Sequence, residues 1–470
     1  RGGARRSSLK ADRVIGVSSK GATMRSMLAL VMVAGSIAGA GHNVVVPLGD
    51  PQPQRWFGYG DIRFFAIDNA GVAYGADIEA FRDPAALPVR GDDTGITVIP
   101  SSSGYSLGGG VARVTPSGRF LLTATGFQYE PDVCPQGEGF GFSTSRDLLF
   151  EIETDDVTFF TPLCPSFTAL ELSNDGCVVV GDEDDFSGPT RTQHAAVWRD
   201  GLVSRLSLPA HATRGDADGS RAVDVSADGT VIAGSSFWRE SNGSPPEAAV
   251  VLWIDGAPSL LPVFEIDGEA ASSTAYALSS DGASVLGARW TYRPSLDTGG
   301  WVESSLVYWI YRDGRFQSLG SVPGDEFVGG FASNGAIAFG STSLDWIDPE
   351  RRGLTWTSAT GLVDAVDYLA GLGVDLVGEH ILRVDAMSES GHWMLVTLRV
   401  DDELEQFARI RVPCSPADLT ADRAIALDDL LAYAERFAGG HPLADLNADG
   451  VLDLADIVAF LTLYADGCPG

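Results

Sequence analysis

The sequence predicts a mainly β protein, a seven-bladed β-propeller made of repeats of about 53 residues, followed by a small α-helical domain. Three observations predict this fold class. A glycine-centred turn pattern recurs seven times along the body of the chain. Short apolar runs of strand length flank each copy, and after Pro413 the apolar residues adopt helical spacing instead.

The first 40 residues predict a secretory signal. Arg25 follows Met24, an apolar run extends over residues 27–37, and small residues at 38–40 favour cleavage after Ala40. We interpret residues 1–23 as an upstream mis-start and expect a secreted protein, extracellular or on the cell surface. A buried apolar helix is the alternative. The run is too short to span a bilayer, so we expect no transmembrane anchor.

The charge balance limits the partners that the protein can have. The chain has 63 acidic and 32 basic residues, which gives a formal net charge of −31. Binding to nucleic acid or to an anionic membrane surface needs clustered Lys and Arg, so the composition argues against both partners. We also expect a monomer.

The body, residues 41–412, carries the repeats. Each contains an apolar residue, a short polar stretch, a glycine and an apolar strand, as in LSNDGCVVVG, VSADGTVIAG and LSSDGASVLG. Asn-Gly, Asp-Gly and Ser-Gly provide the positive φ that a tight hairpin turn requires. The turn glycines are Gly71, Gly118, Gly176, Gly229, Gly282, Gly335 and Gly391.

A second hairpin follows within single repeats. The pattern predicts a strand, a tight turn and a second strand in both AAVWRDGLVSRLSLP and AVVLWIDGAPSLLPV. Two hairpins make four strands per repeat, and such units bury both faces only by stacking around an axis, as in a propeller. An open solenoid is the alternative.

Ring closure depends on the two ends of the repeat region. The last repeat contains strands near His380–Asp385, His392–Val400 and Gln406–Val412, which leaves one strand missing. The segment Asn43–Val46 is apolar enough to provide it, and such pairing would hide both sheet edges.

These repeats resemble a known family. The S-x-D-G-x-x-x-x-G signature, followed by an Ala-x-x-Trp-like strand, is similar to HAF-type repeats of bacterial extracellular proteins. The resemblance extends over residues 41–412 and implies a propeller-like repeat domain, but no reaction. A sialidase Asp-box has one more residue between Asp and Gly than Asp228-Gly229 allows, which argues against sialidase chemistry.

Residues 413–470 predict a calcium-loop domain. Loop positions 1, 3, 5, 7, 9 and 12 offer the hard oxygens that calcium prefers, and Gly450 occupies the sixth position, where the chain turns sharply. An acidic turn without metal is the alternative. We expect Leu454, Ile457, Val458 and Leu461 to form one apolar helix face. The predicted ligands are Asp445, Asn447, Asp449, the Val451 carbonyl, Asp453 and Asp456.

A weaker copy lies 27 residues earlier, over Asp418–Asp429. Arg423 replaces the turn glycine and Ala426 offers no ligand at position 9, so we expect weak or absent metal binding. Leu427, Leu430 and Leu431 would still form the apolar face of its helix. The weak second site comprises Asp418, Thr420, Asp422 and Asp429.

Two such loops, each followed by a helix, resemble a type I dockerin domain, which is EF-hand-like. The resemblance implies calcium as cofactor and a cohesin-like or cell-surface protein as partner. In that family, loop positions 10 and 11, often Ser-Thr, contact cohesin. Here they are Leu454-Ala455 and Leu427-Asp428, which departs from the pattern.

The five cysteines all follow the signal segment, and secretion permits disulfides. Cys414 and Cys468 bracket the C-terminal domain, so we pair them. Cys134 pairs with Cys164 in our hypothesis, although Cys177 is able to replace either partner.

No catalytic residues are predicted. We interpret the acidic runs at Asp155-Asp156 and Asp182–Asp185 as solvated loops, and the histidines lack zinc-protease spacing. Trp198, Trp253 and Trp309 recur at comparable positions, which favours core packing, with carbohydrate stacking as the alternative.

We therefore expect a non-enzymatic propeller that acts as a binding platform, with a calcium-dependent domain for assembly or attachment. The alternative is a dockerin-bearing carbohydrate-active enzyme, a glycoside hydrolase or lyase, with catalytic carboxylates on the propeller. A non-repeated acidic pair facing the central channel would favour the enzyme. A third alternative is a purely structural component of a cell-surface layer.

Overall fold

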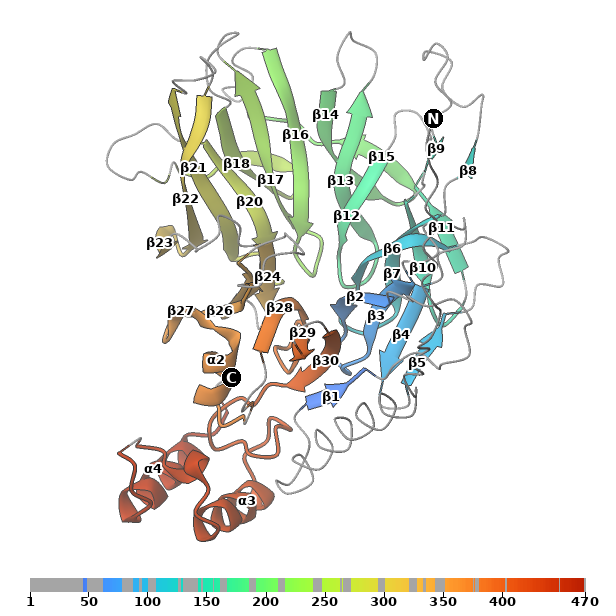
Figure 1. Ribbon diagram of the computed structural model, residues 1–470. Coiled ribbons are helices and arrows are strands. Elements are labelled where there is room, and N and C mark those ends of the chain that lie inside the picture. The colour runs from blue at the N-terminus through green and yellow to red at the C-terminus, as the bar shows by residue number, and fades with distance from the viewer. Residues whose placement is uncertain are drawn as a thin grey trace, which may run out of the picture. The chain divides into compact units, whose positions relative to one another are not determined.

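The computed structural model of the chain is built from antiparallel sheets, with two helices near the C-terminus (Figure 1). Residues Val44–Gly470 form one compact unit. The described residues are 45–48, 62–77, 88–92, 95–99, 107–125, 128–129, 143–144, 147–154, 156–160, 167–185, 192–209, 216–239, 247–262, 264, 272–294, 301–320, 328–332, 335–342, 351–374, 376, 380–401, 404–447 and 449–468. The predicted signal segment lies outside them.

The strands of the first three repeats form four-stranded antiparallel units. The first unit contains β2 (Ile62–Ile67), β3 (Ala73–Asp77), β4 (Pro88–Asp92) and β5 (Gly95–Val98). The second contains β6 (Leu107–Val114), β7 (Phe120–Thr125), β10 (Asp147–Glu151) and β11 (Asp156–Phe159), beside the short pair β8 (Gln128–Tyr129) and β9 (Ser143–Thr144). The third contains β12 (Phe167–Leu172), β13 (Val178–Asp185), β14 (Thr192–Arg199) and β15 (Leu202–Arg205).

The later repeats follow the same plan. The fourth unit, joined to the third by a single parallel pairing, contains β16 (Asp216–Val225), β17 (Val231–Arg239), β18 (Glu247–Ile254) and β19 (Ala257–Leu260). The fifth contains β20 (Ser272–Leu278), β21 (Ser284–Pro294), β22 (Trp301–Arg312) and β23 (Arg315–Gly320). The sixth contains β24 (Val328–Ala332), β25 (Ile337–Ser341), β26 (Gly353–Thr357), β27 (Gly361–Asp364) and the short helix α2 (Ala365–Gly371).

The last unit contains both ends of the repeat region. It orders β1 (Val45–Pro47), β30 (Leu404–Arg411), β29 (Trp393–Asp401) and β28 (His380–Met387). Val45 pairs with Ile410 and Pro47 with Ala408. The predicted closure by the N-terminal strand is therefore confirmed.

The hairpin predictions are also confirmed. All seven turn glycines have positive φ, between 69° and 81°. The second hairpins of the third, fourth and fifth units turn through Asp-Gly pairs in which both residues have positive φ, for example Asp200 at 51° and Gly201 at 82°. This is the signature of a two-residue turn whose twist matches the strands that it joins.

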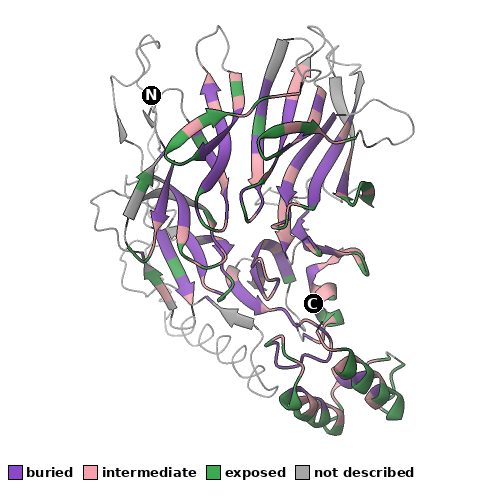
Figure 2. Cartoon of the chain, turned by 180° about the vertical axis from the view of Figure 1, so that it is seen from behind, coloured by how far each residue is buried: buried purple, intermediate pink, exposed green. Residues whose placement is uncertain are grey.

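The hydrophobic core lies between successive sheets, whose strands contain most of the buried residues coloured in Figure 2. Leu286 and Trp356, for example, belong to one cluster although they lie in neighbouring units. The last and first units share a cluster that contains Trp393 and Phe64. The first strand of each unit neighbours that of the next, and β28 neighbours β2. The described sheets thus form a closed β-propeller arrangement, unlike an open solenoid.

The C-terminal residues form two helices, α3 (Leu427–Ala438) and α4 (Leu454–Asp466), with a short 3-10 turn, η2 (Pro442–Ala444), between them. Their shared core centres on Tyr433 and Phe460, whose rings stack at a centroid distance of 4.0 Å. Among the described residues, no helix is long and apolar enough to cross a membrane.

Candidate functional site

The second loop, Asp445–Asp456, folds around its first carboxylate. Asp445 accepts hydrogen bonds from the backbone N–H groups of Asp449 at 3.2 Å and Gly450 at 2.7 Å. Gly450 has a φ of 81°, which side chains other than glycine rarely adopt. The predicted turn glycine therefore lets the loop bring two N–H groups to one carboxylate.

The other end of this loop is fixed by Asp456. Its carboxylate accepts N–H hydrogen bonds from Leu446, Asn447 and Asp453 at 2.9, 3.3 and 2.9 Å. The bond from Asp453, followed by the other N–H groups, lowers the pKa of Asp456 below its usual range. Asp453 in turn caps α4 by accepting from Ala455 at 2.7 Å. The oxygen-rich donor set of this loop fits calcium.

The first loop, Asp418–Asp429, brings its carboxylates closer together. One oxygen each of Asp418, Asp422 and Asp429 lie within 4.8 Å of one another. In the part of the chain that the structure describes, the second loop contains no acidic trio that meets this distance. Burial, and then the charge of Asp429, raises the pKa of Asp418.

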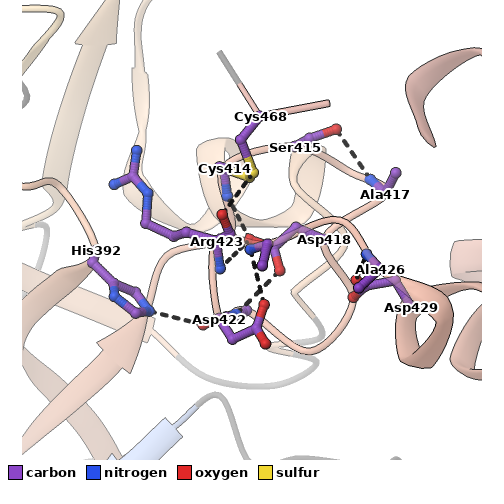
Figure 3. Close-up of a disulfide and its surroundings, with 12 residues drawn as sticks. His392, Cys414, Ser415, Ala417, Asp418, Asp422, Arg423, Ala426, Asp429 and Cys468 are labelled. Carbon is purple, nitrogen blue, oxygen red and sulfur yellow. Dashed lines mark hydrogen bonds between the residues drawn. A yellow bond between two sulfur atoms is a disulfide. The ribbon is translucent and has the colours of Figure 1, made fainter. Parts of the chain in front are cut away.

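The first loop also contacts the last unit of the propeller. Arg423 has a φ of 64°, where glycine is usual, and its guanidinium donates to the Ser390 carbonyl. Figure 3 shows this side chain extending away from the loop carboxylates. His392 Nε2 lies 2.8 Å from the Ala421 carbonyl oxygen. A further contact lies outside the loop: Arg436, on α3, donates to the carbonyl of Gly373, just after α2 of the sixth unit, at 3.2 Å.

A disulfide joins Cys414 to Cys468, as the sequence predicts, across a Cα–Cα distance of 5.4 Å (Figure 3). It ties the two ends of the helical domain together. Cys177 is exposed and is free among the described cysteines. Cys134 and Cys164 lie outside the described residues, so their pairing stays a prediction.

The apolar helix faces differ from the sequence prediction. Leu430 and Ile457 pack against the domain core, but the other five leucines and valines predicted on these faces are exposed. Each helix has two apolar stripes, and the bulky aromatic residues Tyr433 and Phe460 take the inner one. The outer stripes, with Val451 from the second loop, form an exposed apolar surface, which we call the outer face: Leu427, Leu431, Val451, Leu454, Val458 and Leu461.

The second candidate site is a cavity of about 340 Å³ lined by the first strand of every unit, from β2 to β28. The residue five positions before each turn glycine lines it. Four of these residues are small and three, on the neighbouring strands β6, β12 and β16, are charged. In chain order they are Ala66, Arg113, Glu171, Asp224, Ala277, Gly330 and Ala386.

Bulges in the first strands bring these residues to the cavity. In β12 the pairing with β13 shifts between Ala169 and Glu171, and in β16 the pairing with β17 shifts between Ala222 and Asp224. One extra residue in a strand re-aims the side chains that follow it. The charged residues thus occupy equivalent places in adjacent units.

The cavity carboxyl groups are held by short hydrogen bonds. Arg113 Nε lies 2.5 Å from a Glu171 carboxylate oxygen. Asp224 accepts from the N–H groups of Leu278 at 2.6 Å and Val225 at 2.7 Å. On β28, Arg383 lies 2.9 Å from Asp385.

Burial raises the pKa of Glu171, and the nearby Arg113 only partly opposes this rise. Burial, and then the charge of Glu171, raises the pKa of Asp224 well above its usual range, although its two backbone donors favour the ionised form. The sequence reading missed this pair. Its signal was a charged residue at a repeat position that is otherwise small.

The other sequence candidates take structural roles. Trp198, Trp253 and Trp309 are buried in the cores between sheets, which confirms the packing interpretation. The acidic run Asp182–Asp185 was wrongly predicted as a solvated loop. It lies in β13, with Asp182 and Asp184 buried, and Asp182 pairs with Arg221 at 3.0 Å. Asp156 begins β11, whereas Asp155 lies outside the described residues.

Comparisons with known proteins give distant likenesses only. No protein-family model and no curated protein matches the chain. TolB from Acinetobacter baumannii is similar at 15% identity and a TM-score of 0.35, over 74% of this chain and 63% of that one. Prolyl oligopeptidase B from Galerina marginata is similar at 12% identity and a TM-score of 0.43, over 75% of this chain and 49% of that one. The tricorn protease is similar at 9% identity and a TM-score of 0.41, over 88% of this chain and 42% of that one. The fold assignment therefore rests on the sheet topology.

Proposed function

We propose that the protein is a secreted or cell-surface, non-enzymatic seven-bladed propeller that acts as a binding platform. A dockerin-like domain, residues 413–470, attaches it to a partner in a calcium-dependent way. The outer face carries this proposal, since it places six large apolar side chains in water on one small domain. Large exposed apolar side chains gathered on one domain are typical of interaction sites.

The outer face is assembled from equivalent residues of the two loop–helix copies. Leu427 and Leu454 occupy the same loop position, and Leu431 and Val458 follow one helical turn later. Because both loops end in the first turn of these helices, metal in a loop would hold the attached helix in place. A cohesin-like protein with an apolar docking surface is the partner that this geometry favours.

The proposal is tested with two matched substitutions in the full chain. Leu454→Ser alters the outer face, where the Leu454 residue is 72% exposed. Leu202→Ser, on β15, is the control, because Leu202 is 73% exposed and lies outside that face. We expect a panel of purified cohesin domains, tested by interferometry, to include one that binds with calcium and not with a chelator. Leu454→Ser should abolish that binding and Leu202→Ser should leave it intact.

Sedimentation velocity of the wild-type chain provides the opposing outcome. A monomer supports attachment to a different protein. A dimer that Leu454→Ser dissociates and Leu202→Ser does not would show that the outer face joins two copies of this chain, and would overturn the attachment proposal.

A second candidate function is a carbohydrate-active enzyme that uses Glu171 and Asp224. The observation that favours it is the non-repeated acidic pair in the central cavity, with both pKa values raised. Glycoside hydrolysis needs one protonated and one ionised carboxyl group. Release of reducing ends from a polysaccharide panel, lost in both Glu171→Gln and Asp224→Asn, would support it, and equal release by these variants would exclude it.

A further inference from the structure

The central cavity breaks the symmetry of the repeat. Residues that only stabilise a blade recur from unit to unit, as the turn glycines and core tryptophans do. The charges of Arg113, Glu171 and Asp224 do not recur, although they share one position of the repeat. The four small residues at that position leave the space that the cavity occupies. Such a pattern indicates selection for a ligand.

Acidic groups outnumber basic ones around the cavity. Its lining includes two arginines, Arg113 and Arg383, and four carboxyl groups, Glu171, Asp224, Asp385 and Glu389. Arg113 pairs with Glu171, and Arg383 pairs with Asp385. Asp224 and Glu389 are hydrogen-bonded to neutral groups, namely backbone N–H groups and the Asn174 amide. A positively charged ligand would balance this excess.

Aromatic rings complete the lining. Phe65, Tyr276 and Phe331 border the cavity from β2, β20 and β24. Tyr276 is held by packing against Trp290 and Tyr308, at centroid distances of 6.2 and 6.1 Å. Apolar rings in the lining of a pocket favour a ligand that has a hydrocarbon part. A hydrated metal ion would make no use of these rings.

We propose that this cavity binds a small aliphatic ammonium compound, with its charge near Glu171 and Asp224 and its hydrocarbon part against the aromatic rings. The volume of about 340 Å³ is enough for a small organic molecule. The ammonium group would replace water around carboxyl groups that are costly to ionise when the cavity is empty. This inference rests on the proposed role as a binding platform and gives that platform a ligand class.

The test is isothermal titration calorimetry of the full chain at pH 8 with calcium held constant. The probe is 1,4-diaminobutane, and 1,4-butanediol is the uncharged control of matched length. We expect one diamine to bind per chain and the diol not to bind. Glu171→Gln and Asp224→Asn should each weaken diamine binding by roughly tenfold, because each removes one charge-assisted contact.

Two further variants separate the cavity from general attraction to an acidic protein. Arg113→Gln removes a positive charge from the lining and should strengthen diamine binding. Glu153→Gln removes an exposed carboxylate outside the cavity and should have no effect. Because the Arg113 and Glu171 variants are predicted to act in opposite directions, simple loss of folding cannot imitate the result.

Three outcomes would overturn the proposal. One is equal binding of diamine and diol, and another is equal weakening by Glu153→Gln and Asp224→Asn. The third is binding of a neutral disaccharide in place of the diamine, which would favour the enzyme. Each leaves attachment through the outer face untouched, because that proposal is measured on Leu454→Ser.

Discussion

The two loops of the C-terminal domain share one sequence pattern but differ in what they contact. The second loop keeps every predicted calcium ligand and the turn glycine, and it is largely exposed. The first loop lacks a ligand at position 9 and the turn glycine, yet residues 418–421 and Asp429 are buried, and it contacts the propeller through Ala421 and Arg423. The loop that matches the calcium pattern less well is therefore the one that contacts the propeller.

The substitution at the sixth loop position shows how this exchange works. A glycine there serves only the turn, as Gly450 does. Arg423 adopts the same left-handed conformation at a steric cost of about 1 kcal/mol, and its side chain gains a contact with the Ser390 carbonyl. A loop that departs from the calcium pattern can thus carry a contact surface instead.

The largest expected effect comes from removing the ends of the second loop. In the Asp445→Ala, Asp456→Ala variant we expect calcium binding to disappear, because these residues provide loop positions 1 and 12. Calorimetry should give one calcium per wild-type chain and none in the variant. Two calcium ions per wild-type chain would break the comparison, since the clustered carboxylates of the first loop would then bind metal too.

A matched pair of substitutions sharpens the contrast. Asp449→Asn and Asp422→Asn change the fifth position of the second and first loops. Each replaces a carboxylate with a neutral amide, so calcium affinity should fall roughly tenfold or more in the loop that binds metal. We expect this fall for Asp449→Asn alone, measured by competition with a fluorescent chelator.

Arg423→Gly tests the docking role more gently. It relieves the strained backbone by about 1 kcal/mol and removes the contact with Ser390, so the two effects nearly cancel in global stability. We expect faster amide hydrogen exchange in residues 418–429 with an almost unchanged melting temperature. The calcium stoichiometry should stay at one, because Ala426 still offers no ligand. A second bound calcium would contradict this expectation.

The smallest effect is expected for His392→Ala. The substitution removes a single hydrogen bond to the Ala421 carbonyl, worth roughly 1 kcal/mol. Exchange should quicken at the first loop and stay constant in the second. His194→Ala, on β14, is the control, and an equal response to it would show that the histidine contact does not hold the loop.

The sequence predicted the parts of the fold that depend on local backbone conformation. Gly229 and Asp200-Gly201 need positive φ, and this need is visible in a single hairpin. Closure by β1 was predictable because the last repeat lacked one strand. The calcium loop stays a prediction from spacing, since all six proposed ligands lie within 12 residues.

The missed features depend on long-range packing. The acidic run of β13 looks solvated in sequence, but Arg221, on the next unit, offers a partner that permits burial of Asp182. Hydrophobic periodicity could not tell which stripe of α4 is buried, because both stripes are apolar. The buried stripe is the one that contains Phe460, which packs in the core of the domain. The charged cavity positions emerge only when strand bulges align equivalent residues around the ring.

The pairing of β1 with β30 has a mechanical consequence. A pull on the C-terminal domain reaches the propeller just after β30, and the Cys414–Cys468 bond holds the two ends of that domain together under the load. β30 is hydrogen-bonded to β29 on one side and to β1 on the other, so a load along it shears two ladders at once. The hydrogen bonds between Val45–Pro47 and β30 would therefore carry part of any tension applied to the C-terminal end of the protein.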